Sequence, residues 1–516
     1  MNHVSDENKE KYDFCLVSLW NEPVFVNPLY NFTRTAINKI TAPIISKKLF
    51  EINPNIAISE DEKSVLRYQI KYPCAPALLA LAAVLEEKYR VCIISLDVER
   101  EQTDEKDWIE AITSKIVGKT KYGILISFVS TEITQLMQFT STIKKINKDM
   151  KVVIGGVHAT YNDYDLLQYE YIDYVVRNEG EQTIMELCDA LVCGKDVVSI
   201  DGLSYKHDRK IEKNKDRPFI NLEQLPLPAY HLVEKFINKI VLTTMFSRGC
   251  PYQCAYCAES AFWTSNVRYK NTEKFVDELE LLCNLYNQHF IHIADSTFGV
   301  SREKLIELCD ELEKRQINAF FSINIRPNVF QYMGENLLRR LKKLNFVELY
   351  MGVESADTDV IQSLNRLQGD DLFTVLRKLK IIGFPFVKLY LMIGTPFDSR
   401  KSFEKTVNLI ETLLDEELIF YATCKYFVPS IGSPIYSQIN SDISLHDVSY
   451  RLDRYNSPPA YVPNETIAQE MDLYLQMIQV VQYKFYYKKS DIQMQESMKL
   501  EWEKFVSRNY LRGHYF

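Results

Sequence analysis

Three cysteines, Cys250, Cys254 and Cys257, carry the strongest chemical signal in the sequence. A cubane iron–sulfur cluster usually takes four thiolate ligands, so the Cys-x3-Cys-x2-Cys spacing leaves one iron without a protein ligand. That open iron can bind a substrate or a cofactor. Gly249 and Pro251 flank the first cysteine and favour a tight turn at this point.

The alternatives for the triplet are a structural zinc site and a chance grouping. A structural zinc site needs a fourth Cys or His ligand. The nearest downstream candidates, Cys283 and His289, lie about a helix away. The other eight cysteines are scattered through apolar or helical contexts, which is typical of reduced core residues. The spacing therefore favours an iron–sulfur cluster.

The triplet follows the first of six strand-like runs that alternate with helical stretches. These runs cover residues 241–246, 290–293, 319–324, 347–351, 387–392 and 419–427. Six such units fall short of the eight units of a closed barrel, so the pattern predicts a partial (β/α)6 barrel of TIM type over residues 241–436. Barrel active sites lie at the carboxyl ends of the strands, which is where the triplet falls.

An earlier alternation of strands and helices predicts a separate α/β domain over residues 1–193. The expected strands are 14–18, 91–95, 123–128, 152–154 and 171–176, with helices at 77–87, 132–145 and 181–191. This order predicts a Rossmann-like (flavodoxin-like) parallel sheet with helices on both faces. Residues 20–72 are too long for a simple connection and are either an extra subdomain or a functional insertion.

Residues 194–240 are polar and are predicted to form the linker between the two domains. They contain a probable hairpin at 202–212 and the stretch Leu225-Pro-Leu-Pro-Ala-Tyr-His231, whose prolines stiffen the chain. Residues 437–516 read as a helical C-terminal region. Because no cysteine occurs from Gln438 onward, we expect no auxiliary cluster there.

Composition narrows the partners of this 516-residue chain. The net charge of −8 and the pI near 5.7 argue against nucleic acid or an anionic membrane as the main partner. No stretch offers the roughly 20 apolar residues of a membrane span. The polar start lacks the apolar stretch of a signal peptide. These features predict a cytoplasmic protein that acts on a small molecule or a peptide.

With the aromatic Tyr256 just before its last cysteine, the triplet resembles the signature of the radical S-adenosylmethionine (SAM) superfamily. The resemblance implies a [4Fe-4S] cluster whose unique iron chelates the amino and carboxylate groups of SAM. It also implies that one-electron reduction cleaves SAM to a 5′-deoxyadenosyl radical. An electron donor such as flavodoxin or ferredoxin is then the expected protein partner.

Further matches to this superfamily lie at the ends of the predicted barrel strands. Ala294-Asp295-Ser296 follows the second strand, where the family contacts the amino group of SAM, and Met351-Gly-Val-Glu-Ser355 resembles the family's Gly-Val/Ile-Glu-Ser segment. Taken singly, Gly394 and Pro396 are explained by a turn and Glu354 by a salt bridge. The resemblance implies SAM contacts at Tyr256, Asp295, Ser322, Arg326, Glu354, Gly394, Pro396 and Val428.

The N-terminal domain contains neither Gly-x-Gly-x-x-Gly nor a phosphate-loop Lys-Ser/Thr, which disfavours a dinucleotide or a nucleoside triphosphate. Small and polar residues instead follow its strands, at the edge where open α/β sheets bind ligands. Adjacent glycines admit a large planar ligand, and hydroxyls can bind its periphery. Tight turns, with His158 as a capping or core residue, explain the same pattern. The candidate ligand contacts are Ser127, Thr131, Gly155, Gly156, His158, Glu179 and Gly180.

Beside the cysteine triplet, this domain and the Leu-Pro-Leu-Pro-Ala-Tyr linker are similar to the cobalamin-binding branch of the superfamily. The resemblance covers most of residues 13–436. Many cobalamin domains carry Asp-x-His-x-x-Gly after the first strand, whereas this chain reads Leu19-Trp-Asn-Glu-Pro-Val24. The departure implies base-off cobalamin without a histidine ligand, or a domain that has lost the cofactor.

The resemblance implies a methyltransferase that moves a methyl group from methylcobalamin to an unactivated carbon, or less often phosphorus, by way of the 5′-deoxyadenosyl radical. One alternative is a cobalamin-assisted rearrangement, ring contraction, cyclisation or carbon–carbon coupling without methyl transfer. The alternative from another class is a non-enzymatic redox or sensor protein.

Overall fold

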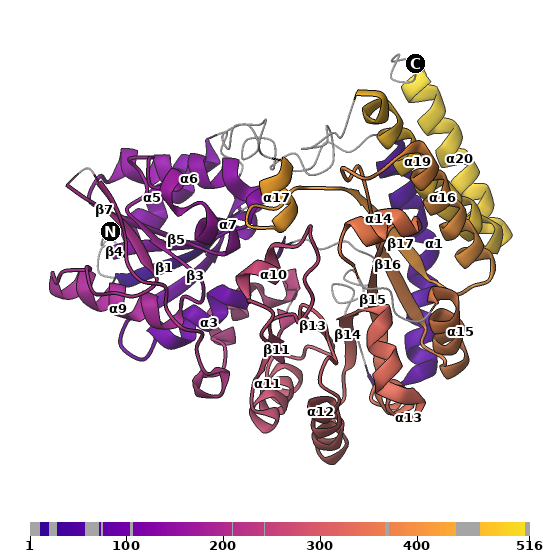
Figure 1. Cartoon of the computed structure of the whole chain (residues 1–516), viewed down its shortest axis with the longest axis horizontal. Coiled ribbons are helices and arrows are strands. Elements are labelled where there is room, and N and C mark those ends of the chain that lie inside the picture. The colour runs from indigo at the N-terminus through magenta and orange to yellow at the C-terminus, as the bar shows by residue number, and fades with distance from the viewer. Residues whose placement is uncertain are drawn as a thin grey trace, which may run out of the picture. The chain divides into compact units, whose positions relative to one another are not determined.

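The computed structural model describes residues 11–19, 28–56, 72–73, 76–103, 107–208, 210–241, 243–366, 371–439 and 465–510 (Figure 1). Its internal contacts divide the chain into two compact units. The first contains residues 1–23, 70–278 and 429–453, and the second contains residues 24–69, 279–428 and 454–516. The cysteine triplet thus shares a unit with the N-terminal sheet. The domain boundaries expected at residues 193, 240 and 436 stay predictions.

The first unit is built on a seven-stranded sheet in the order β3-β1-β4-β5-β6-β7-β8. The strands β3, β1, β4, β5 and β6 are parallel, and they reproduce the 2-1-3-4-5 order of flavodoxin-like folds. The predicted hairpin exists and extends the sheet as two antiparallel strands. The strands are β1 (Tyr12–Ser18), β3 (Val91–Ser95), β4 (Thr120–Ser127), β5 (Lys151–Gly155), β6 (Tyr174–Val176), β7 (Leu203–His207) and β8 (Lys210–Lys213).

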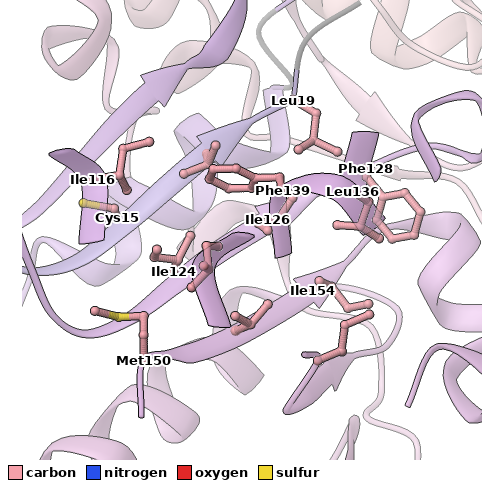
Figure 2. Close-up of a cluster of buried hydrophobic side chains, with 14 of the residues drawn as sticks. Cys15, Leu19, Ile116, Ile124, Ile126, Phe128, Leu136, Phe139, Met150 and Ile154 are labelled. Atoms are coloured by element: carbon pink, nitrogen blue, oxygen red, sulfur yellow. The ribbon is translucent and has the colours of Figure 1, made fainter. Parts of the chain in front are cut away.

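Helices cover this sheet because each turns an apolar stripe toward it. Ile124 and Ile126 of β4 share a buried cluster with Leu136 and Phe139 of α6 (Figure 2). The buried strands are hydrophobic on both faces, which is why they read as continuous apolar runs. The helices are α3 (Pro76–Leu85), α4 (Leu96–Arg100), α5 (Trp108–Lys119), α6 (Ile133–Ile146), α7 (Val157–Tyr161), α8 (Asp163–Leu166) and α9 (Glu181–Cys193).

The remainder of the first unit holds the linker and the cysteine-containing segment. The strand expected at 241–246 is replaced by two short strands, and β9 pairs in parallel with β2. The elements are β2 (Tyr72–Pro73), η2 (Leu222–Gln224), η3 (Tyr230–Lys239), β9 (Ile240–Val241), β10 (Thr243–Thr244), β11 (Ser247–Arg248), α10 (Ala258–Phe262), β12 (Arg268–Tyr269), the start of α11 (Thr272–Asn284) and α17 (Pro434–Ile439).

The barrel strands form a six-stranded sheet in chain order, β10-β13-β14-β15-β16-β17, which confirms the βα repeat predicted for the barrel. Its strands β13 to β17 are parallel and belong to the second unit. Figure 1 shows β14 to β17 side by side with helices beside them. The strands are β13 (Phe290–Ile293), β14 (Phe320–Ile325), β15 (Phe346–Glu354), β16 (Phe386–Ile393) and β17 (Tyr421–Tyr426). The helices between them are α12 (Arg302–Arg315), η4 (Pro327–Val329), α13 (Phe330–Lys343), α14 (Thr358–Ser363), α15 (Leu372–Ile382) and α16 (Arg400–Asp415).

The described part of the 20–72 insertion is mainly one 25-residue helix, α1 (Pro28–Ile52), of the second unit. It packs against α19 (Glu465–Lys489) and contacts α20 (Ile492–Tyr510). Its Ile37 and Ile40 share a buried core with Phe320 and Phe386 at the starts of the strands. The insertion therefore helps to build this unit, and α19 and α20 confirm the helical C-terminal region. In the part of the chain that the structure describes, no helix has both the length and the apolar character of a membrane span.

Candidate cluster and cofactor sites

The cysteine loop, defined as residues 249–267, begins and ends at two short strands that pair with each other. Arg248 of β11 lies opposite Arg268 of β12, and Ser247 lies opposite Tyr269. Gly249 opens the loop with φ +113°, and an added Cβ would lie 1.8 Å from the carbonyl oxygen of Asn266. Only glycine fits this turn, because both the conformation and the space exclude a side chain.

The three cysteines lie on the first part of this loop. The Cys254 side chain is buried, those of Cys250 and Cys257 are partly exposed, and none forms a disulfide. The Cys257 backbone N–H donates to the Cys254 carbonyl oxygen at 3.1 Å, and Ser260 Oγ donates to the Cys257 carbonyl oxygen at 2.7 Å. Burial, helped by the Glu259 carboxylate, raises the pKa of Cys257 to about 12. A metal that binds this thiolate would displace the proton.

The cysteines do not converge as ligands of a single ion. Among the described residues, no three His, Cys, Asp or Glu side chains gather closely enough to hold one metal ion. A cubane places its thiolates on separate irons and hence farther apart, whereas structural zinc draws its ligands onto one centre.

A buried ion-pair group ties the cysteine loop to the N-terminal sheet. Arg248, which is 8% exposed, donates from Nη1 to Glu179 Oε1 at 2.8 Å and from Nη2 to Glu181 Oε1 at 2.7 Å. Glu179 lies in the segment that connects β6 to α9, and Glu181 is the first residue of α9. Although burial opposes the charged form, the two carboxylates raise the pKa of Arg248. The guanidinium therefore stays charged and bridges the two segments.

Arg268, at the other end of the loop, binds the same carboxylate. Its Nη1 donates to Glu179 Oε2 at 2.8 Å and its Nη2 donates to Glu179 Oε1 at 3.0 Å. Its guanidinium also lies over the rings of Phe219 and Trp263, 4.6 and 5.5 Å from their centroids. The Ile220 N–H adds a further hydrogen bond to Glu179 Oε2 at 2.9 Å. Glu179 was predicted as a ligand contact, but four donors from the protein occupy its carboxylate.

The glycine-rich edge of the sheet follows β5. Gly156 has φ +110°, and an added Cβ would lie 2.5 Å from the carbonyl oxygen of Phe128. The backbone at Gly156 therefore packs directly against the backbone at Phe128. His158 is buried, and burial lowers its pKa to about 4, so its ring is neutral. Its Nδ1 lies 2.8 Å from Ser130 Oγ and its Nε2 lies 3.4 Å from Asn162 Nδ2. Both ring nitrogens thus face partners inside the protein, as expected of a core histidine.

The remaining predicted contacts of this edge come from three strand ends. Ser127 is partly exposed at the end of β4, Thr131 lies in the helical turn that follows, with its side chain outside the described set, and Gly180 precedes α9. Val129, two residues after Ser127, is 55% exposed and adds apolar surface at this strand end. The cobalamin motif with an axial histidine would follow β1. The structure describes only Leu19 of that segment.

The glycine-rich edge and the cysteine loop lie against each other within the first unit. Helix α7 begins directly after Gly156, α10 begins directly after Cys257, and the two helices are in contact. The segment around Gly432 joins both. An added Cβ on Gly432 would lie 2.2 Å from the Tyr161 ring, and the Ile435 N–H donates to the Ala255 carbonyl oxygen at 2.9 Å. The predicted cobalamin edge and the predicted cluster loop therefore form one connected site.

Most of the predicted SAM contacts lie in the second unit, whereas Tyr256 lies in the cysteine loop of the first. Asp295 is buried just after β13, and Arg326 is buried just after β14. Ser322 lies within β14, is fully buried, and its Oγ is 2.8 Å from His292 Nδ1. Gly394, Pro396 and Val428 follow β16 and β17. The structure thus brings these positions to the carboxyl side of one sheet, with Ser322 set inside its strand.

Glu354 has an unusual conformation at the end of β15. Its φ is +70°, and the pairing of β15 with β16 shifts register between Gly352 and Glu354. Its Oε1 lies 3.0 Å from Arg366 Nη1, and Arg366 also donates to the Gly352 carbonyl oxygen. A Cβ on Gly352 would lie 2.6 Å from Glu354 Oε1. Strain of this kind is held where the surroundings fix it, often at functional sites.

The sequence did not point to Arg248, Arg268 or Arg366. Arg248 and Arg268 pair with Glu179 across 69 and 89 residues of sequence, and Arg366 pairs with Glu354 across a helix. The one local clue is that Arg248 and Arg268 flank the cysteine loop, where they give it a basic residue near each end.

Known protein families match both the segment with the cysteine loop and the N-terminal sheet domain. Residues 244–410 match the family model of the radical SAM superfamily, and residues 71–188 match that of the B12-binding domain. An uncharacterised methyltransferase of Pyrococcus horikoshii is 27% identical over 344 residues, which cover 65% of this chain and 72% of that protein.

Two further proteins show the range of this similarity. The anaerobic magnesium-protoporphyrin IX monomethyl ester cyclase of Rubrivivax gelatinosus is 30% identical over 281 residues. That match covers 52% of this chain and about half (49%) of the cyclase. The radical SAM methyltransferase TsrM of Kitasatospora setae, solved with cobalamin and a [4Fe-4S] cluster, superposes with a TM-score of 0.59 at 16% identity and covers 71% of this chain and 72% of TsrM. With both domains present in this order, the chain belongs to the cobalamin-dependent radical S-adenosylmethionine enzyme family.

Proposed function

We propose that this protein is a methyltransferase that transfers a methyl group from SAM, by way of cobalamin, to an unactivated carbon, or less often phosphorus, of a small molecule or a peptide. The observation that carries the proposal is the joined site of the first unit. There the cysteine loop contacts the glycine-rich edge through α7 and α10 and is bound to it by Arg248 and Glu179. Radical and methyl chemistry need their cofactors close together, because the protein contributes mainly position and shelter from water.

The residues divide into three proposed groups. The cluster ligands are Cys250, Cys254 and Cys257. The SAM contacts come from Tyr256 and the strand ends of the second unit, namely Asp295, Ser322, Arg326, Glu354, Gly394, Pro396 and Val428. The cobalamin edge is formed by Ser127, Thr131, Gly155, Gly156, His158, Glu179 and Gly180. With these cofactors bound, the cluster and SAM would supply a 5′-deoxyadenosyl radical, and cobalamin would supply a methyl group.

The chain's own residues support base-off cobalamin without a histidine ligand. His158, the histidine at the glycine-rich edge, has both ring nitrogens facing partners in the protein. Its burial keeps the ring neutral, and Phe128 lies against it with ring centroids 5.1 Å apart. We therefore assign His158 to the packing of α7 beneath the ligand edge. Glu179 has a positioning role, because both of its oxygens are held by arginines.

We further propose that the protein works in the cytoplasm and receives its electron from a small redox protein such as flavodoxin or ferredoxin. Reductive cleavage of SAM needs a one-electron donor, and the chain's three grouped cysteines provide for a single cluster. Titration of the oxidised cluster with reduced flavodoxin, followed by the optical spectrum of the cluster, measures this transfer.

The proposed reaction is tested with cofactor-loaded, reduced protein, methyl-labelled SAM and candidate substrates. Methyl transfer yields S-adenosylhomocysteine together with 5′-deoxyadenosine, and the label enters the acceptor. Formation of 5′-deoxyadenosine alone, with substrate turned over and cobalamin bound, rules the methyltransferase out.

The second candidate is a cobalamin-assisted cyclisation or other carbon–carbon bond formation without methyl transfer. The specific observation in its favour is the 30% identity to the Rubrivivax gelatinosus cyclase, which exceeds the 27% identity to the Pyrococcus horikoshii methyltransferase. Since that match spans about half of the cyclase, its substrate does not transfer to this chain. A product that lacks the methyl label identifies this reaction.

A further inference from the structure

Glu179 binds both ends of the cysteine loop at once. Arg248 precedes the loop, Arg268 follows it, and the two are register partners in the β11–β12 pair. Both guanidinium groups donate to Glu179, and Arg248 reaches Glu181 as well. Since the first cysteine lies two residues after Arg248, the position of Glu179 fixes where the loop begins and closes.

The backbone that carries Glu179 belongs to the predicted cobalamin edge. Glu179 precedes Gly180, and the Asn178 N–H donates to Thr160 Oγ1 at 2.9 Å. Thr160 lies on α7, directly after the Gly155–Gly156 turn. A chain of named contacts thus runs from the glycine-rich edge through Asn178 and Glu179 to the cysteine loop.

The burial of this group makes it sensitive to displacement. Glu179 and Glu181 are 6% and 5% exposed, and Arg248 is 8% exposed. Each charge has lost most of its water, so its hydrogen-bond geometry must be kept to avoid a large desolvation cost. A shift of the β6–α9 segment therefore moves the ends of the cysteine loop with it, because breaking the pairs is more costly than moving together.

We propose that Glu179 couples the two cofactor sites, so that cobalamin bound at the glycine-rich edge strengthens the hold of the cysteine loop on its cluster. The proposal rests on the proposed function only in taking both cofactors as bound by this chain. Coupling of this kind is reciprocal and typically changes an affinity by about 5-fold to 150-fold. A cluster already in place should then raise the affinity for cobalamin by the same factor.

The test measures the rate at which an iron chelator removes the cluster from full-length, anaerobically reconstituted protein, with and without bound hydroxocobalamin. We expect bound cobalamin to slow the loss of iron by about 5-fold or more. Equal rates in protein whose cobalt content shows full occupancy overturn the proposal.

Glu179→Gln removes the charge that both arginines bind. In this variant we expect the rate of iron loss to be the same with and without bound cobalamin. Arg268→Lys is the second variant. It keeps the charge and removes the bidentate contact with Glu179, so we expect cobalamin to slow the loss of iron less than in the parent protein. Retention of full protection in either variant contradicts the assigned role of Glu179.

The matched control is Glu186→Gln, which breaks the ion pair of Arg217 with Glu186 on α9. It removes a carboxylate from an arginine pair of the same unit but leaves the cysteine loop untouched, so full protection by cobalamin is expected. The outcomes also separate this inference from the proposed function. Absence of cobalt binding refutes the function, whereas cobalt binding and methyl transfer without protection refute the coupling alone.

Discussion

Arg248 Nη1 and Glu179 Oε1 lie 2.8 Å apart, although 69 residues separate them along the chain. This buried pair places the start of the cysteine loop against the carboxyl edge of the N-terminal sheet. It explains why the triplet belongs to the first contact unit, while the sequence pattern groups it with the barrel strands. The proposed cluster loop and the proposed cobalamin edge therefore belong to one compact unit.

Removal of one cysteine should separate the two sites. Cys254→Ala deletes the most buried of the three proposed ligands, so we predict loss of the cluster iron and of its visible absorption. At saturating hydroxocobalamin, the cobalt content should remain close to one per chain, because the residues of the glycine-rich edge are unchanged. The matched control is Cys309→Ala, a buried cysteine on α12 outside the triplet. If Cys254→Ala keeps its iron, the ligand assignment is wrong.

Gly156 should resist substitution. Gly156→Ala places a Cβ 2.5 Å from a backbone oxygen in a conformation that glycine alone adopts readily, so we predict a loss of about 3 kcal/mol of unfolding free energy. Gly194→Ala is the control. Its φ is +64°, with no atom near the added Cβ, and it should cost about 1 kcal/mol. Urea unfolding of both variants measures this difference. Equal costs show that the contact with Phe128 has no effect.

The variant Gly156→Ala should also bind cobalamin more weakly, whereas Gly194→Ala should bind it like the parent protein. Equilibrium dialysis with hydroxocobalamin measures the affinity of both. Unchanged affinity in Gly156→Ala removes the glycine-rich edge from the proposed binding site.

The free energy of unfolding should depend on pH through the titration of Glu132. Burial raises the pKa of Glu132 from 4.5 to about 7, with the Asp97 carboxylate adding to the rise, although the Val129 N–H favours the ionised form. A raised folded-state pKa gives stability that is complete below pH 4.5 and is lost as the pH rises toward 7. Glu132→Gln should therefore match the parent protein near pH 4.5 and exceed its unfolding free energy by about 1–2 kcal/mol at pH 8. A difference independent of pH contradicts this assignment.

The strained end of β15 should control SAM binding. Gly352→Ala keeps all charges but forces Glu354 away from Arg366, and Arg366→Gln leaves Glu354 without its cation. We expect both variants to weaken SAM binding about tenfold, which corresponds to about 1.4 kcal/mol. Arg377→Gln is the control, because it breaks an exposed ion pair with Glu416 in the same unit. Dialysis against labelled SAM measures all three. Unchanged affinity in Gly352→Ala excludes Glu354 from the SAM site.

Local patterns predicted the strands because buried parallel strands are continuous apolar runs, as in β4 and β16. The strand expected at 241–246 was wrong in its continuity, since β9 pairs with β2 while β10 is the edge strand of the six-stranded sheet. No local pattern indicates that Arg248 and Arg268 meet at Glu179, because such pairs depend on the folded chain. The same holds for α1, whose Ile37 and Ile40 are buried by strands that follow far later in the sequence. The sequence thus offered candidates for the chemistry-bearing residues but did not indicate the arginines that position the cysteine loop.

Anaerobic reconstitution followed by iron and cobalt counts shows whether one compact unit of this chain holds both a radical SAM cluster and cobalamin. We expect about four iron atoms and one cobalt per chain, with 5′-deoxyadenosine released from SAM upon reduction. Protein that takes up iron but leaves cobalamin in solution, or that binds both and never cleaves SAM, contradicts this expectation.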